Sequence, residues 1–163
     1  MQKPNFAEAI EKIVQQDSRF DPDAYMFVRE GLDFTVKMLK KNPQGPPPHR
    51  HVSGQELLDG LRRYALEQFG PMSKTVLSHW GVKQCEDFGD IVFNMVEKGI
   101  LGKTEQDRRE DFKGGYDFEE AFVRPFQPEH PRYVRHARSA AHGNRRRDKN
   151  LNPGPEKLSS GSN

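Results

Sequence analysis

Basic side chains gather towards the C-terminal end of the sequence, and they are the residues best suited to bind another molecule. Between residues 132 and 149 only Asp148 opposes seven cationic side chains: Arg132, Arg135, Arg138, Arg145, Arg146, Arg147 and Lys149. A guanidinium group can hold a phosphate through two hydrogen bonds, and a disordered cationic segment binds RNA or DNA without sequence preference. The segment therefore predicts contact with nucleic acid or a ribosome, and a solubilising terminus is the alternative.

The net charge of +2 conceals an asymmetry along the chain. Residues 1–126 carry 18 basic and 21 acidic side chains, whereas residues 127–163 carry 8 basic and 3 acidic ones. No aromatic residue occurs from position 135 onward, so that stretch has little with which to build a core. We expect a mildly acidic folded body followed by a disordered basic tail over residues 127–163.

No pattern in the sequence is typical of a catalytic or metal centre. A Walker loop, a dinucleotide fingerprint, a GxSxG elbow and an HExxH helix are all absent. Ser73, His79 and Cys85 lie close in sequence, but core or capping roles explain them better than a shared reaction. His49 and His51 have no identifiable further ligands. We therefore expect no metal, no cofactor and no enzymatic activity.

The expected cellular location of the protein is inferred from segments and residues that the sequence lacks. No apolar run approaches the roughly 18–20 residues of a membrane-spanning helix, and the start MQKPNFAEAIEKIV has no apolar region typical of a secretory signal. Cys85 is the only cysteine, which excludes an intramolecular disulfide and agrees with a reducing compartment. We expect a cytoplasmic protein that has no contact with a membrane.

Two helices and a linker must precede the central part of the chain. Residues 4–16 carry apolar side chains at helical spacing, and Asp21-Pro22 is typical of the start of a second helix that reaches about Lys41. The following segment NPQGPPPHRH contains four prolines and cannot continue a helix. The sequence predicts an N-terminal helical pair over residues 1–41 and a proline-rich linker over residues 42–52.

Three shorter helices are expected next. Ser53 and Glu56 form a capping-box pattern, Gly70-Pro71 ends the first helix, and the other two run over about residues 72–80 and 85–98. The alternation around Ile100-Leu101 and Tyr116-Asp117-Phe118 favours a small β-hairpin. We therefore expect a mainly α fold with a winged helix-turn-helix-like body over residues 53–126, and a four-helix arrangement with a disordered loop as the alternative.

The third of these helices is too acidic to read DNA. Its outward positions include Glu86, Asp87, Asp90 and Asn94, and a carboxylate brought near a phosphate is repelled and desolvated. We expect this face of the body to contact an unidentified protein partner instead.

The string HVSGQELLDGLRRYALEQFGPMSKTVLSHWGV, followed by EDFGDIVFNMVEKGIL and EDFKGGYDFEEAF, resembles a family of proteins of unassigned function found mainly in planctomycetes and verrucomicrobia. The earlier stretch RFDPDAYMFVREGLDFTVKML is similar to the amino-terminal half of that family. The resemblance covers about residues 6–123 and leaves out the basic tail. It implies a bacterial cytosolic protein and carries over no catalytic residue.

These observations together predict a non-enzymatic bacterial binding or regulatory protein, with a body that contacts protein and a tail that contacts nucleic acid or a ribosome. The alternative is a small enzyme of unknown reaction, with a pocket between the helical pair and the body. A pocket lined by converging titratable groups would favour the enzyme, and an exposed apolar groove would favour a binding module.

Overall fold

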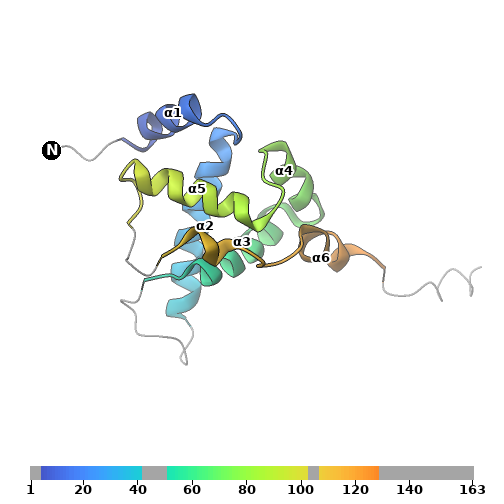
Figure 1. The fold of residues 1–163 in the computed structure, drawn as a ribbon. Helices are drawn as coiled ribbons and strands as arrows, with labels where there is room; N and C mark the ends of the chain where they lie inside the picture. Colours follow the sequence, from blue (N-terminus) through green and yellow to red (C-terminus); the bar gives the residue numbers. More distant parts are fainter. Residues whose placement is uncertain (1–4, 42–50, 103–106, 129–163) are drawn as a thin grey trace, which may run out of the picture. The chain divides into compact units, whose positions relative to one another are not determined.

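The computed structural model describes residues 5–41, 51–102 and 107–128, and within these ranges it contains helices and no strand (Figure 1). The elements in chain order are α1 (Phe6–Gln16), α2 (Pro22–Lys40), α3 (Gly54–Phe69), η1 (Gly70–Met72), α4 (Ser73–His79), α5 (Cys85–Glu97), η2 (Arg109–Phe112), α6 (Phe118–Phe122) and η3 (Arg124–Phe126). None of the described helices is long and apolar enough to span a membrane.

Side-chain caps explain where the longer helices begin. The Asn5 side chain accepts a hydrogen bond from the Ala7 N–H at the start of α1, and Asp21 does the same for Asp23 at the start of α2. At α3, Ser53 Oγ accepts from the Glu56 N–H at 3.2 Å, while Glu56 Oε1 accepts from the Ser53 N–H at 3.4 Å. These contacts satisfy N–H groups that have no partner within the helix.

One hydrophobic core holds the helices together. Helix α2 packs along α3, and α5 crosses α2, as Figure 1 shows. The core therefore includes side chains from both helices of the N-terminal pair and from the helices that follow residue 53. By their internal contacts the residues fall into two units, Met1–Gln127 and Pro128–Asn163, and the core belongs to the first.

The closest approach between α2 and α3 depends on two glycines. A Cβ atom placed at Gly31 would collide with Leu61 Cδ2, and one placed at Gly60 would collide with Thr35 Oγ1. The Thr35 hydroxyl is fully buried and donates to the Gly31 carbonyl at 2.7 Å. The two helix backbones can lie this close only because both positions lack a side chain.

Phe27 lies at the centre of an aromatic cluster between α2, α3 and α5. Its ring centroid is 5.3 Å from Tyr64, 5.9 Å from Phe69, 5.6 Å from Trp80 and 6.3 Å from Phe88. Phe27 itself is buried, and the four rings around it come from three segments: α3, the end of α4, and α5. Such packing contributes both apolar burial and ring–ring attraction.

The predicted β-hairpin and the winged helix-turn-helix-like body are wrong, although the expectation of a mainly α fold is confirmed. The region expected to form the second strand contains the start of α6, where the Asp117 side chain accepts from the N–H groups of Glu119 and Glu120. Phe118 and Phe122 then bury their rings one helical turn apart, with centroids 5.0 Å apart. The alternation around Asp117 was produced by a helix cap and not by a strand.

Candidate functional site

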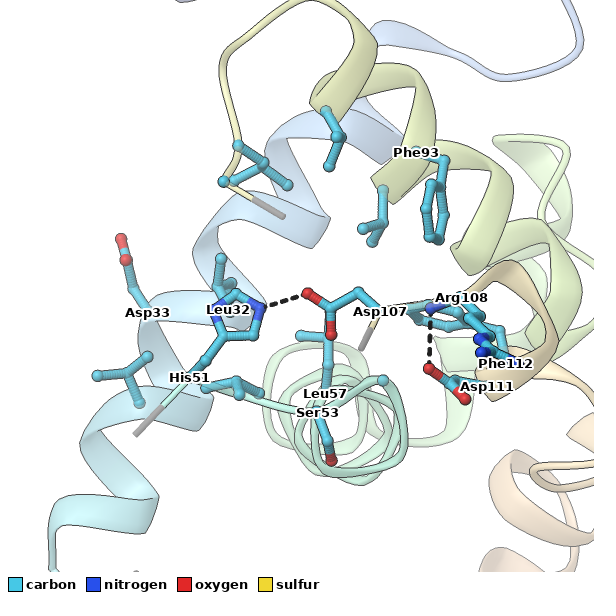
Figure 2. Close-up of a pocket in the computed structure, with 17 residues that line it drawn as sticks. Leu32, Asp33, His51, Ser53, Leu57, Phe93, Asp107, Arg108, Asp111 and Phe112 are labelled. Atoms are coloured by element: carbon cyan, nitrogen blue, oxygen red, sulfur yellow. Dashed lines mark hydrogen bonds and ion pairs between the residues drawn. The ribbon is translucent and has the colours of Figure 1, made fainter. Parts of the chain in front are cut away.

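A pocket of about 360 Å³ lies between α2, the start of α3, α5 and the segment around η2 (Figure 2). Its walls are mainly apolar, and its polar groups come from the chain just before α3, from around η2 and, through Asp33, from α2. The residues that line it are Leu32, Asp33, Val36, His51, Val52, Ser53, Gly54, Leu57, Val92, Phe93, Val96, Leu101, Gly102, Asp107, Arg108, Asp111 and Phe112. The volume falls within the range typical of small-molecule sites.

Two local structures position the polar groups of the pocket. The capping box at Ser53 fixes the direction in which the chain enters α3, and so places His51 beside the pocket. On the other side the Asp111 carboxylate accepts a hydrogen bond from the Arg108 N–H at 3.0 Å, which closes the turn that begins η2. This turn brings Asp107 towards His51.

His51 and Asp107 form the principal polar contact of the pocket. His51 Nε2 lies 2.7 Å from Asp107 Oδ2, and Figure 2 shows the pair between Phe93 of α5 and Leu57 of α3. The imidazole is about half exposed, at 46%, whereas the carboxylate is 22% exposed. The pair joins two segments that are distant in sequence, and a half-exposed imidazole can exchange hydrogen bonds with a ligand in the pocket.

Phe112 forms a rigid part of the pocket because two glycines make room for its ring. A Cβ at Gly54 would lie 3.2 Å from Phe112 Cε2, and one at Gly89 would lie 3.0 Å from Phe112 Cβ. The Phe112 ring meets Phe93 edge to face, with centroids 6.4 Å apart. The aromatic wall is therefore packed from three sides before any ligand arrives.

Ser53, Ser73 and Cys85 carry groups that enzymes use as nucleophiles, but here each of them has a structural role. Ser53 Oγ caps α3, and the buried Ser73 hydroxyl donates to the carbonyls of Ala65 and Gly70. The Cys85 thiol is buried and contacts the backbone of Tyr116, and burial raises the pKa of this thiol. The core or capping roles expected for Ser73 and Cys85 are confirmed.

The four residues expected to bind a protein partner lie on or beside α5, and each has a contact within the chain. Glu86 lies 3.5 Å from the Gly114 N–H, and Asp87 accepts from the N–H groups of Lys83 and Gln84. Asp90 forms ion pairs with Arg19 and Arg109. The fourth, Asn94, donates to Asp17 and to the Tyr25 hydroxyl. Their role in partner binding stays a prediction.

Asp17, Arg19, Asp90 and Asn94 form a polar network that connects the end of α1 with α5. Arg19 donates to both carboxylate oxygens of Asp17, at 2.9 and 2.8 Å, and to Asp90 at 3.1 Å. The side-chain hydrogen bond from Arg19 holds the pKa of the Asp17 carboxyl well below its usual range. The ionised carboxylate therefore contributes to the stability of the contact between α1 and α5.

The depressed pKa of Asp17 predicts a specific dependence of stability on pH. A carboxyl with a lowered folded-state pKa stabilises the fold above its unfolded pKa, near 3.9, and this contribution is lost as pH falls towards the folded value. Asp17→Asn should lower the free energy of unfolding by about 1 kcal/mol at pH 7, since the contact is partly exposed. Its stability should also fall less than that of the wild type between pH 5 and pH 2, measured by urea denaturation.

Asp33→Asn serves as the matched control for this prediction, because Asp33 is exposed on α2 and lies outside the network. The control should retain the steep wild-type loss of stability at acid pH. Parallel curves for the wild type and Asp17→Asn would contradict the proposed role of the carboxylate.

The seven basic residues of the predicted nucleic-acid site, and the proline-rich segment 42–50, lie outside the described residues. The sequence analysis allowed for a pocket between the helical pair and the body, but it did not identify the apolar lining or the His51–Asp107 pair. From the sequence, His51 is at most a weak candidate metal ligand, and no group of three or more His, Cys, Asp or Glu suited to hold a metal occurs in the described ranges. No local pattern could have paired it with Asp107, which approaches through tertiary packing alone.

Comparison with known proteins found no matching family model, no similar curated protein and no similar solved structure.

Proposed function

We propose that this protein is a non-catalytic binding protein, and that its pocket takes a small apolar molecule with one neutral hydrogen-bonding end. The observation that carries this proposal is the apolar pocket of about 360 Å³ with the His51–Asp107 pair beside it. Burial of apolar surface supplies the main driving force for such a ligand. The imidazole and carboxylate favour a hydroxyl or carbonyl over a second carboxylate, because three carboxylates, Asp33, Asp107 and Asp111, line the pocket against one guanidinium, Arg108.

The same pocket is the place where an enzyme of this fold would act, since it lies between α2 and the helices after residue 53. Binding is the better supported reading because valines, leucines and phenylalanines from four segments form its walls. Two of its polar groups have structural contacts, since Asp111 accepts from the Arg108 N–H and Ser53 Oγ caps α3. A reaction needs a nucleophile or base aimed at a bound substrate.

Filling the pocket should abolish binding of an apolar probe. Val96 on α5 is only partly buried and lines the pocket, so Val96→Phe adds a ring to the space that a ligand needs. We expect 1-octanol to shift the methyl NMR signals of Leu57 and Val92 saturably in the wild type. Its affinity should be at least about tenfold lower in Val96→Phe, because the added ring and the probe compete for one volume.

Val76→Phe provides the matched control, since Val76 is a partly buried valine on α4 that lies outside the pocket. This variant should bind 1-octanol like the wild type. Equal affinities for the wild type and Val96→Phe, or shifts scattered over the whole body, would exclude the pocket as the binding site.

We also propose that the basic segment 132–149 contacts nucleic acid or ribosomes, on the strength of its charge in the sequence alone. Deletion of residues 129–163 should abolish retention of the protein on immobilised RNA at low salt. The melting temperature should stay nearly unchanged, because the core found in the described part of the chain is built from residues 10–122. Unaltered retention on RNA would reject the proposal.

The salt dependence of RNA binding tests which part of the protein binds the RNA. Binding through phosphate neutralisation weakens steeply as salt rises, whereas binding through the helical body should depend less on salt. Duplex DNA binding that survives the deletion would instead implicate the body.

A further inference from the structure

A second hollow, of about 260 Å³, lies between α2, α3 and the end of α4, and we call it the aromatic hollow. It shares no lining residue with the pocket described above. Its lining consists of aromatic rings, two carboxylates, one amide and one thioether: Asp23, Met26, Phe27, Glu30, Tyr64, Gln68, Phe69 and Trp80. The lining includes no lysine, arginine or histidine.

The aromatic rings of the hollow are held at fixed angles to one another. Phe69 and Trp80 meet nearly at right angles, with an interplanar angle of 79° and centroids 5.6 Å apart. Phe27 packs behind both of them and also stacks on Tyr64. Phe27 is buried, whereas the other three rings are partly exposed, so they present aromatic surface to the hollow.

Negative charge surrounds these rings. The Tyr64 hydroxyl donates to Glu30 Oε2 at 2.9 Å, which fixes this carboxylate beside the ring, and Asp23 lines the hollow from the first turn of α2. Glu67 adds a further negative charge near Tyr64. Burial and the Glu30 carboxylate together raise the pKa of Tyr64 above its ordinary value.

We propose that the aromatic hollow binds an organic cation of the methylated alkylammonium type. The faces of aromatic rings attract cations, and Trp and Tyr do so more strongly than Phe. The carboxylates of Asp23 and Glu30 add to this attraction and disfavour an anion. A methylated ammonium suits the site better than a primary ammonium, because it gives up less hydration and its methyl groups contact the rings.

The experiment uses choline chloride as the probe and follows the indole N–H signal of Trp80 by two-dimensional NMR. Trp80 is the only tryptophan in the chain, so this signal reports on the hollow without ambiguity. The comparison probe is 3,3-dimethyl-1-butanol, which has the shape of choline and no charge. We expect a saturable shift with choline at constant ionic strength, and at least about tenfold weaker binding of the neutral analogue.

Two variants test the contribution of the carboxylate. Glu30→Gln retains an acceptor for the Tyr64 hydroxyl but removes the charge, and it should weaken choline binding about threefold to tenfold. Glu8→Gln removes an exposed charge from α1 and should leave the affinity unchanged. The proposal is overturned if choline produces no saturable shift, if the neutral analogue binds equally well, or if both variants weaken binding to the same extent.

Discussion

Replacement of Phe27 with alanine lowers the free energy of unfolding by about 3–5 kcal/mol, the range expected when a buried phenylalanine is truncated. The ring is buried and lies within 6.3 Å of four other aromatic centroids, so its loss leaves a cavity that these rigid neighbours cannot fill. Single domains are stable by only about 5–15 kcal/mol, and the variant should therefore unfold at a much lower urea concentration.

Met26→Ala is the control, because Met26 precedes Phe27 on α2 but is 42% exposed. Its unfolding free energy should lie within about 0.5–1 kcal/mol of the wild type. Circular dichroism during urea denaturation measures both variants. A loss below about 1.5 kcal/mol for Phe27→Ala would mean that the cluster is looser than described, since even poorly packed core sites lose the transfer free energy of the side chain.

Replacement of Gly60 with alanine should destabilise the protein by about 1–3 kcal/mol, even though alanine is the better helix former. The gain in helix propensity is at most about 1 kcal/mol. Against it stands a collision of the new methyl group with the Thr35 side chain, which is buried and held by its hydrogen bond to Gly31. Relief of the collision requires α2 and α3 to move apart, so the steric cost should exceed the gain.

Gly102→Ala is the control that tests whether replacing any glycine with alanine lowers the melting temperature. A Cβ at Gly102 meets nothing within 4 Å, and this position does not have a positive φ. Thermal unfolding should show a melting temperature for Gly102→Ala close to that of the wild type and a clear decrease for Gly60→Ala. A melting temperature for Gly60→Ala at or above the wild-type value would show that the two helices can separate at little cost.

Much of the helical structure could be predicted because its boundaries are local. The Asp21-Pro22 start of α2 and the Ser53–Glu56 capping box before α3 lie where the sequence pattern indicates. The strand prediction for residues 100–102 and 107–118 is wrong because short apolar runs fit either a strand or a helix. Asp117 can occur in a strand as readily as it caps a helix. Its position two and three residues before Glu119 and Glu120 was the available indication of a helix start.

The candidate site could not be predicted for a different reason. Its lining residues come from four segments, and each segment alone has an ordinary structural explanation. Val92 and Val96 are regular apolar positions of a helix, and Leu57 belongs to the face of α3 that meets the core. The pocket arises only where α2, α3 and α5 pack together and leave a space between them. Hydrophobic periodicity predicts which side chains face the core, but it does not predict such a space.

The close packing of Gly54 and Gly89 against Phe112 limits which residues of the pocket can be changed. Because Gly54 and Gly89 lie against Phe112, a methyl group at either position would press on the ring and require it to shift. Val36 and Val96 line the pocket and are only partly buried, so these two valines should tolerate smaller or larger aliphatic residues. Directed evolution towards new ligands should therefore accumulate its changes at these valines and leave both glycines untouched.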